Sequence, residues 1–333
     1  MTDLDVRETS GQSESEGSED YSESTLVIVT PADVGRRLDV FLASLLPEQS
    51  RARLQRWVEE GSVLVDGRLA RSSLSLRAGQ RIEIQEPEQE AQGDWLAEPM
   101  RLDLLFEDDQ VLVLNKPSGL VVHPAAGHPK GTLLNGLLAH CPELRAIPRA
   151  GIVHRLDRDT TGLMVVAKTP LAQVDLVRQL QARSVSRLYW ALVWGRPAGA
   201  RVLSGDIGRD PRDRQRMAVV SAGGKPAATH IEPKGEGVLE GRPVTLVVCR
   251  LETGRTHQIR VHLQEAGFPL VGDATYTRRA PLPGRSIGFE RQALHAYRLS
   301  FLHPERRVEV AFEADLPKDF ADLLERAGMK HPR

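Results

Sequence analysis

The chain has 333 residues, of which 41% are hydrophobic and 27% charged, the composition of a globular protein with a sizeable core. No apolar run approaches the ~18 residues that span a bilayer, and the acidic, serine-rich start is unlike a secretory signal. Two cysteines, Cys141 and Cys249, are too few for a disulfide framework or a zinc site. We therefore expect a cytoplasmic protein that uses neither a membrane nor a metal.

The charge is distributed unevenly along the chain. The first 25 residues carry eight acidic residues against Arg7 alone, so the rest of the chain carries a net charge of +6 although the total is −1. Residues 1–24 are poor in apolar side chains and rich in like charge, which predicts a disordered tail. The basic remainder suits an RNA-binding surface, although a charge of +6 over this length is also ordinary for a globular protein.

Residues 25–85 predict a small domain of strands and helices. "TLVIV" reads as a short strand, and "RRLDVFLASLL" has apolar residues at helical spacing. "RARLQRWVEEG" predicts a second helix that ends at Gly61. "SVLVDGRLA" predicts a strand, a turn at Asp66 and Gly67, and a returning strand, and "AGQRIEI" predicts the last strand.

This order of elements resembles the S-four-type RNA-binding module, which is named after a small-subunit ribosomal protein. The resemblance covers about residues 35–85 and rests on "GRRLDVFL", "SRARLQRWVEEGSVLVDG" and "AGQRIEI". In that family the second helix and the turn after it face RNA. The resemblance therefore implies RNA contacts for four arginines: Arg37, Arg51, Arg53 and Arg56. Their spacing alone is equally consistent with a solvated helix face.

A linker and a larger domain follow. Residues 86–99 hold charges, glycine and proline with almost no apolar pattern, so they predict a linker. From residue 100 to about 325, short strands are predicted at "VLVLN", "LMVVAK", "RLYWALVWG", "THIEPKGE", "VTLVVCRLE" and "RVEVAFEA". Helices are predicted at "GTLLNGLLAH", "LAQVDLVRQLQA" and "RTHQIRVHLQEAG", the last capped by Thr256 and closed at Gly267. This pattern predicts an α+β fold with a mainly antiparallel mixed sheet.

Several familiar site motifs are excluded by their surroundings. "HRLDRDTTG" lacks the residue order of a kinase catalytic loop, and "GRSIG" at 284–288 has no strand before it to form a nucleophile elbow. His257 and His262 are five residues apart, so they do not share a helix face as a zinc pair would. No glycine-rich phosphate loop is present. We therefore predict neither a nucleotide cofactor nor a metal.

Four polar stretches carry the candidate chemistry of the larger domain: "NKPSGLVVHP" (115–124), "GIVHRLDRDTTGLMV" (151–165), "SRLYWALVWG" (186–195) and "LETGRTHQIRVHLQEAGFPLVGDATY" (251–276). With "ALHAYRLSFLHP" at 293–304, they resemble the pseudouridine synthases of the RluA/RluD type over about residues 100–325. The resemblance implies that Asp157 is the catalytic aspartate and that Tyr189 and Arg260 complete the catalytic set. Basic residues of the same stretches are predicted to contact RNA: Lys116, His123, Arg155, Arg158, Arg255 and His257.

The reaction implied by this resemblance needs no cofactor, because the N1–C1′ bond is broken and the uracil is turned and rejoined through C5 with no redox change. An ionised carboxylate is needed beside the ribose, either to attack C1′ or to take the 2′ hydrogen. A guanidinium would keep that carboxylate charged, with Arg260 as the candidate and Arg155 and Arg158 as alternatives. Tyr189 could stack on the uracil and accept the C5 proton, although its ordinary pKa near 10 opposes this.

Asp159, two residues after Asp157, is predicted to be structural, hydrogen-bonding the backbone of the turn that follows it. Pairing of the RNA-binding module with this catalytic domain implies large-subunit ribosomal RNA as the substrate, and we expect a monomer. Two alternatives stay open: a transfer RNA substrate, and a non-catalytic RNA-binding factor for ribosome assembly. The second would be expected to lack the aspartate, tyrosine or arginine, and all three are present.

Overall fold

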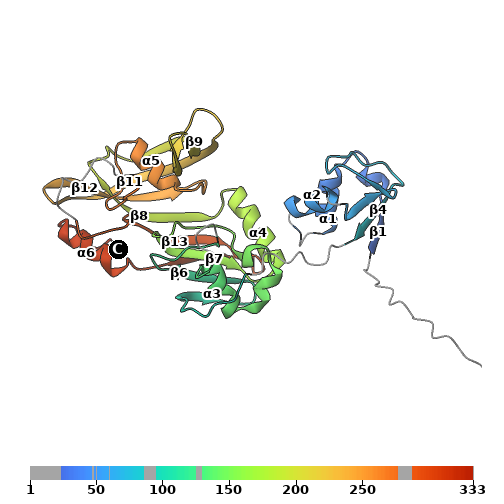
Figure 1. Cartoon of the computed structure of the whole chain (residues 1–333), viewed down its shortest axis with the longest axis horizontal. Helices are drawn as coiled ribbons and strands as arrows, with labels where there is room; N and C mark the ends of the chain where they lie inside the picture. The colour runs from blue at the N-terminus through green and yellow to red at the C-terminus, as the bar shows by residue number, and fades with distance from the viewer. Residues whose placement is uncertain are drawn as a thin grey trace, which may run out of the picture. The chain divides into compact units, whose positions relative to one another are not determined.

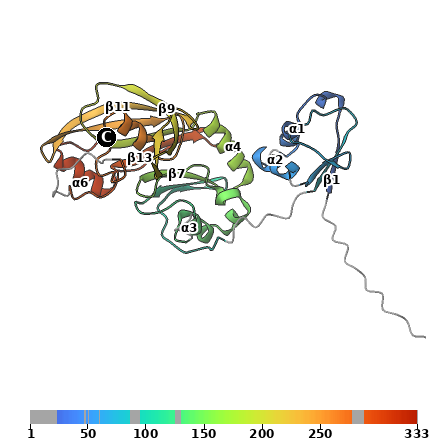
Figure 2. The same cartoon turned by 45° about the horizontal axis from the view of Figure 1, so that its top comes forward.

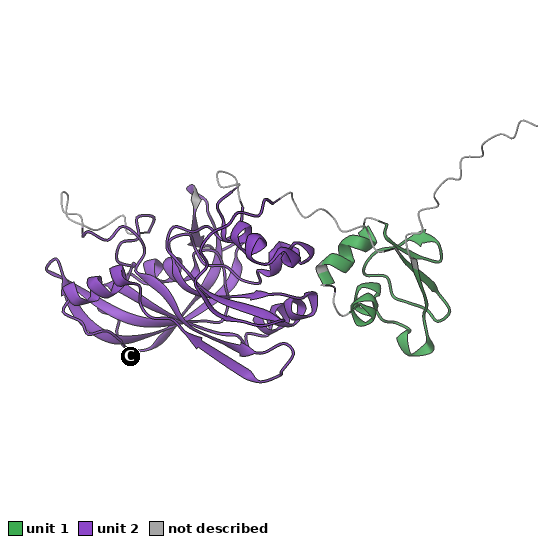
Figure 3. Ribbon diagram, turned by 90° about the horizontal axis from the view of Figure 1, so that it is seen from below, with its two compact units in different colours: residues 1–46, 50–88 green, residues 47–49, 89–333 purple. Residues whose placement is uncertain are grey.

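The computed structural model describes residues 24–46, 49, 51–59, 61–85, 95–124, 130–276 and 287–332. The chain forms two compact units, residues 1–46 with 50–88 and residues 47–49 with 89–333, which Figure 3 colours separately. The predicted tail up to residue 23 and residues 86–94 of the predicted linker lie outside the described residues. Each unit has a hydrophobic core of its own, so each is described separately.

The first unit is a four-stranded antiparallel sheet packed against two helices. The sheet order is β1-β4-β2-β3. Its strands are β1 (Ser24–Ile28), β2 (Val63–Val65), β3 (Arg68–Leu69) and β4 (Arg81–Gln85), and its helices are α1 (Leu38–Leu45) and α2 (Arg51–Glu59). Leu42 of α1 and Leu54 of α2 are completely buried against Ile82 of β4 and its neighbours. The turn between β2 and β3 lies at Asp66 and Gly67, both at positive φ, as the sequence predicts.

The second unit is built on a ten-stranded mixed sheet of order β10-β9-β11-β12-β8-β13-β7-β6-β5, with β14 paired to β13. Neighbouring strands run antiparallel except for the parallel pair β13–β7, which confirms the predicted mixed sheet. The strands are β5 (Leu104–Glu107), β6 (Val111–Lys116), β7 (Thr161–Ala167), β8 (Ser186–Trp194), β9 (Arg201–Asp210), β10 (Asp213–Val219), β11 (Lys225–Leu239), β12 (Arg242–Leu251), β13 (Leu294–Leu302) and β14 (Glu309–Glu313).

Helices cover this sheet. They are α3 (Leu133–His140), α4 (Pro170–Gln181), α5 (Gln258–Glu265) and α6 (Lys318–Arg326). Figures 1 and 2 both place α5 beside β9 and β11, and α4 beside β7. The predicted helix at "RTHQIRVHLQEAG" is therefore present, but it begins at Gln258. Thr256 is not its cap, since His257 occupies the N-cap in the left-handed conformation (φ 56°).

The central strand β8 divides two cores. Tyr189 belongs with Ala191 to the core that also contains Ile259 of α5, whereas Trp190 and Leu192 belong to a core on the opposite face. This alternation is the one that the strand periodicity predicts. It turns Tyr189 toward the layer of the sheet that α5 covers.

The strand β7, which follows the aspartate-rich loop, begins at a close approach of two backbones. All seven residues of β7 are buried, and Gly162 pairs with Ala296 of the parallel strand β13. Gly162 has φ of 117°, and a Cβ there would lie 2.3 Å from the carbonyl oxygen of Ala296. Only glycine allows the chain to pass here, so the loop before it is fixed against β13.

Candidate active site

The loop of residues 153–160 presents Asp157 and is fixed from several sides. Lys116 Nζ donates to the carbonyl of Arg158 (2.7 Å), and Arg291 donates to the carbonyl of Asp159 (3.4 Å). Within the loop, the Thr160 amide donates to the Asp157 carbonyl (3.1 Å). These contacts come from elements far apart in the sequence, so the position of the loop is set by the tertiary fold.

The carboxylate of Asp157 is bonded by Arg260, which lies on α5. Arg260 Nη1 donates to Asp157 Oδ2 (3.1 Å), while its Nε and Nη2 form a bidentate pair with Asp273 (2.7 and 3.0 Å). Burial opposes the charge of Arg260, yet the bonds to Asp273 and Asp157 raise its pKa above the usual value. Because Arg260 stays cationic, Asp157 keeps a fixed positive partner.

A histidine and a tyrosine complete the surroundings of this pair. His257 Nδ1 lies 2.9 Å from the Tyr276 hydroxyl, and its Nε2 lies 3.9 Å from Asp157 Oδ1. Burial lowers the pKa of His257, so its imidazole is neutral at pH 7. The ring of Tyr276 also lies against the Arg260 guanidinium, whose Cζ is 4.9 Å from the ring centroid.

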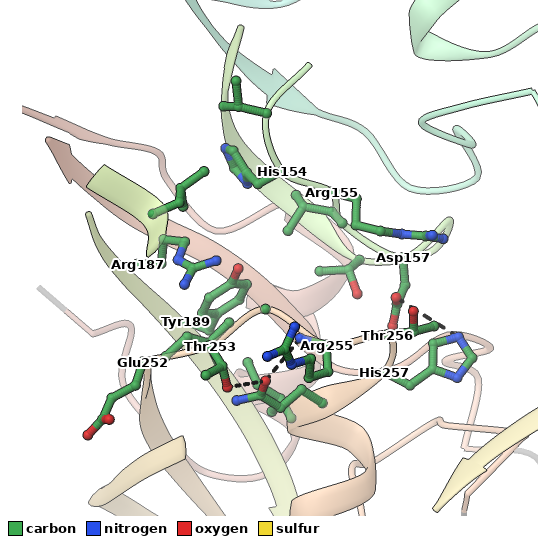
Figure 4. A pocket seen from close by; sticks show the side chains of 18 of the residues that line it. His154, Arg155, Asp157, Arg187, Tyr189, Glu252, Thr253, Arg255, Thr256 and His257 are labelled. Atoms are coloured by element: carbon green, nitrogen blue, oxygen red, sulfur yellow. Dashed lines mark hydrogen bonds and ion pairs between the residues drawn. The ribbon is translucent and has the colours of Figure 1, made fainter. Parts of the chain in front are cut away.

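Asp157, Tyr189 and Arg260 line one pocket of about 810 Å³, a volume in the range of small-molecule sites. Figure 4 shows Asp157 and Tyr189 facing this space from the loop and from β8. Of the residues predicted to contact RNA, four line the same pocket: His123, Arg155, Arg255 and His257. The three predicted catalytic residues therefore meet, although 103 positions separate Asp157 from Arg260.

Burial changes the chemistry that two of these residues can perform. It raises the pKa of Tyr189 to about 12, with the charge of Arg187 opposing the shift, so the phenol is protonated at neutral pH. This opposes the predicted role of Tyr189 as a proton acceptor. Burial also lowers the pKa of His123 to about 4, so His123 is a neutral polar group rather than a cation for phosphate.

Lys116 requires a correction, because it has no access to RNA. It is completely buried, and its ammonium donates to the carbonyls of Pro117 (2.7 Å), Leu120 (3.0 Å) and Arg158. These three bonds use all three N–H groups of an ammonium. The lysine therefore fastens the turn after β6 to the loop of Asp157.

The other charged residues of the loop differ from one another. Arg155 is exposed and lines the pocket, whereas Arg158 is exposed outside the pocket lining and pairs with the Asp159 carboxylate (3.0 Å). The prediction that Asp159 bonds the backbone of the turn is wrong for its side chain, since among the described residues its carboxylate bonds Arg158. Neither Arg155 nor Arg158 takes the place of Arg260 as the partner of Asp157.

In the first unit, the Arg53 guanidinium lies over the Trp57 ring (5.5 Å to the centroid), and two other predicted RNA contacts bond a buried carboxylate. Arg37 and Arg51 both donate to Asp39, whose side chain is completely buried at the start of α1, and Gln55 of α2 donates to it as well (2.8 Å). These bonds hold α2 to α1. Both guanidinium groups are still about half exposed, and Arg56 is exposed on α2, so RNA contact through these residues stays a prediction.

Sequence reasoning missed three residues of the site. Asp273 lies in the polar stretch 251–276, where the sequence predicts no role for it, and it forms the bidentate pair with Arg260. Tyr276 of the same motif contacts His257 and Arg260. Arg187, two residues before Tyr189, lines the pocket although the strand pattern gave no reason to single it out.

Among the described residues, no group of three or more histidine, cysteine, aspartate or glutamate side chains could hold a metal ion. Within the same residues, no helix is both long and apolar enough to cross a membrane. The predictions of no metal and no cofactor stay predictions.

Comparison with known sequences agrees with both halves of the chain. A family model described as RNA pseudouridylate synthase matches residues 110–265, and an S4 domain model matches residues 36–82. A ribosomal large subunit pseudouridine synthase D of Neisseria meningitidis is 49% identical over 335 residues, covering 96% of this chain and 88% of the relative. Its namesake from Pseudomonas aeruginosa is 50% identical over 299 residues, covering 87% and 91%.

Solved structures resemble the larger unit. Human RNA pseudouridylate synthase domain containing 4 is 26% identical, with a TM-score of 0.55 over 69% of this chain and 95% of that chain. Human RNA pseudouridylate synthase domain containing 1 is 27% identical, with a TM-score of 0.50 over 71% of this chain and 100% of that chain.

Proposed function

Since this chain belongs to the RNA pseudouridylate synthase family and is a pseudouridine synthase, we propose that it converts specific uridines of large-subunit ribosomal RNA to pseudouridine. The names of the two bacterial relatives favour ribosomal over transfer RNA. The match to an S4 domain supports an RNA partner for the first unit. A non-catalytic role in ribosome assembly would not require Asp157, Tyr189 and Arg260 to line one pocket.

The observation that carries the proposal is the placement of the Asp157 carboxylate. Arg260 bonds its Oδ2, while its Oδ1 lies 3.9 Å from the neutral His257 and has no hydrogen bond among the described residues. A carboxylate that is fixed by a guanidinium and open to a pocket on one oxygen can act on a ribose that enters that pocket. Either first step fits this geometry: attack of Oδ1 on C1′, or removal of the 2′ hydrogen.

In both routes the N1–C1′ bond breaks and its electron pair stays with the uracil. The uracil then turns and C5 joins C1′, as the bond from Asp157 to C1′ breaks or, in the other route, as the 2′ hydrogen returns to C2′. The C5 proton leaves and N1 takes up a proton, so the product contains the same atoms as the uridine. We assign Tyr189 to the wall on which the uracil stacks, since its buried phenol is protonated at neutral pH. No redox step occurs, which is why we propose a reaction without a cofactor or metal.

The target uridine has to leave its stack to reach Asp157, which costs a few kcal/mol of unstacking. Arg155 and Arg255 line the pocket and are exposed, so they are placed to bind the phosphates on either side of the extruded nucleotide. Binding of this kind weakens as salt rises. We place the enzyme in the cytoplasm, where its proposed substrate is assembled, and propose that it acts as a monomer.

Asp157→Asn tests the assignment. We expect wild-type protein to form pseudouridine in ribosomal RNA transcripts, mapped by sequencing, and Asp157→Asn to lower the rate at least about 10³-fold, as loss of a nucleophile or base does. Asp159→Asn is the matched control, because Asp159 lies in the same loop and pairs with an exposed arginine instead of facing the pocket. We expect it to lower the rate by less than about fivefold. Equal rates for wild type and Asp157→Asn would contradict the assignment.

A further inference from the structure

Arg187 on β8 is a buried cation without a counter-ion. The residue is 6% exposed, and its Nε is buried without a hydrogen-bond partner. Across the described residues, no side chain forms an ion pair or hydrogen bond with this guanidinium. The two other arginines buried to a similar degree in this unit do have carboxylate partners, Asp273 for Arg260 and Asp319 for Arg291.

A guanidinium that gives up water without a partner costs free energy, and arginine cannot escape this cost by losing its proton. Burial does lower the pKa of Arg187, yet a guanidinium remains charged at neutral pH. A ligand group that accepts hydrogen bonds from this guanidinium would remove that cost. For Arg187 the available space is the pocket that it lines.

The position of Arg187 within that pocket is specific. Arg187 and Tyr189 are two residues apart on β8, so their side chains leave the same face of the strand. Figure 4 shows the guanidinium directed toward the ring of Tyr189. Gly254 lines the same pocket, and a Cβ at Gly254 would lie 2.8 Å from Arg187 Nη1, so the glycine leaves the room that the guanidinium occupies.

Tyr189, Asp157 and Arg187 line the same pocket. A uracil stacked on Tyr189 with its ribose at Asp157 would therefore extend its base edge toward Arg187. That edge carries carbonyl oxygens, which accept hydrogen bonds. When the N1–C1′ bond breaks, the electron pair left on N1 is delocalised onto these oxygens, so the acceptors become more negative during the reaction.

Two other arginines of the pocket already have carboxylate partners. Arg260 is bonded to Asp157 and Asp273, and Arg183 is exposed and paired with Glu252 (2.7 Å). A phosphate would suit the exposed arginines at the rim better than Arg187, whose Nε has no access to water.

We propose that Arg187 donates hydrogen bonds to a carbonyl oxygen of the extruded uracil and stabilises the uracil anion formed when the N1–C1′ bond breaks. This inference rests on the proposed pseudouridine synthase activity. It makes Arg187 a fourth catalytic residue, whose contribution is larger in the transition state than in the ground state.

The test compares Arg187→Gln and Arg187→Lys with Arg250→Gln. Arg250 lies on β12 opposite Leu188, is exposed and lies outside the pocket lining, so its substitution removes an arginine from the same part of the sheet. The measurements are the single-turnover rate of pseudouridine formation with saturating protein and the Kd for the same ribosomal RNA transcript. We expect Arg187→Gln to lower the rate about 10²- to 10³-fold with Kd changed less than threefold, and Arg250→Gln to match wild type.

Arg187→Lys provides the second readout. A buried lysine loses its proton at a lower pH than a free one, so we expect this variant to recover part of the rate at pH 7 and to lose it toward pH 9. The wild-type rate should not fall in this way between pH 7 and pH 9. A wild-type rate for Arg187→Gln would overturn the inference. An unchanged rate together with weaker RNA binding and a shallower salt dependence would indicate that Arg187 contacts a phosphate instead. If Arg187→Gln does not fold, a pH profile of Arg187→Lys parallel to wild type overturns it. Failure of wild type itself to form pseudouridine would instead refute the proposed function.

Discussion

The tripeptide Arg-Leu-Asp occurs at residues 37–39 in the first unit and at residues 101–103 and 155–157 in the second. At residues 37–39 and 155–157 the leucine is buried in a core. In the first unit Arg37 reaches back to bond Asp39, and the carboxylate is completely buried. In the second unit Arg155 lines the pocket, and the carboxylate of Asp157 is bonded by Arg260 and remains 15% exposed.

The difference lies in which groups satisfy the carboxylate. Asp39 accepts bonds on both oxygens from Arg37, Arg51 and Gln55, so nothing is left for a ligand. Asp157 has a partner on Oδ2 only, among the described residues. Thus the same local sequence gives a structural aspartate where the chain folds back on it, and a candidate catalytic aspartate where one oxygen faces a cavity.

Replacing the partner of Asp157 should have the largest effect. We expect Arg260→Gln to lower the single-turnover rate about 10²- to 10³-fold, because the carboxylate loses its fixed cation. The same change leaves Asp273 buried without its bidentate partner, so we also expect a loss of about 3 kcal/mol in the free energy of unfolding, measured by urea denaturation. Arg260→Lys keeps the charge and should restore part of the rate. A full rate in folded Arg260→Gln would show that Asp157 does not depend on this partner.

Asp39→Asn should have the opposite profile. Because the amide keeps the shape of Asp39 but loses its charge for Arg37 and Arg51, we expect the first unit to lose about 2 kcal/mol of stability. The single-turnover rate at saturating RNA should stay within about twofold of wild type. Thermal unfolding followed by circular dichroism measures the first effect. A large loss of rate with unchanged stability would contradict the distinction between the two aspartates.

The stability that the Asp39 carboxylate supplies should depend on pH. Hydrogen bonding from Arg37, opposed by burial and supported by Gln55 and Arg51, holds the pKa of Asp39 well below its usual value in the folded unit. The stabilisation is therefore complete above the unfolded pKa of about 4 and is lost as pH falls below it. Wild type should be more stable than Asp39→Asn at pH 6, and the gap should narrow toward pH 3. A constant gap would show that the carboxylate charge is not the source of the stability.

The features that could be predicted from the sequence are those set by a local residue pattern or by a recognisable motif. The alternation on β8 placed Tyr189 correctly, and the turn at Asp66 and Gly67 follows from residues that accept positive φ. The mixed sheet and the loop of Asp157 were also predicted. Some elements were missed: β5, β9, β10, β13 and α6. The strands β9 and β10 carry many charges, and β10 is the edge strand with β9 beside it, so exposed side chains hide the strand pattern.

Long-range partners could not be read from the sequence. Lys116 was predicted to contact RNA, but its three carbonyl acceptors come together only when the loop of Asp157 folds against β6. The helix that carries Arg260 starts at Gln258, one residue later than predicted. His257 is its N-cap, because it takes the left-handed conformation that directs its ring to Tyr276. In each case the deciding contact joins parts of the chain that no local pattern relates.

The smallest effect is expected from the exposed face of α2. We expect Arg56→Gln to weaken binding to ribosomal RNA a few-fold and to reduce the slope of log Kd against log salt by about one, because one phosphate contact is lost. Arg51→Gln removes a residue of the same helix but also a partner of the buried Asp39, so it should lower the melting temperature of the first unit as well. Filter binding at several salt concentrations and thermal unfolding separate the two. Within the first unit the two variants separate RNA binding from stability, since Arg56→Gln should change mainly the salt slope and Arg51→Gln both the slope and the melting temperature.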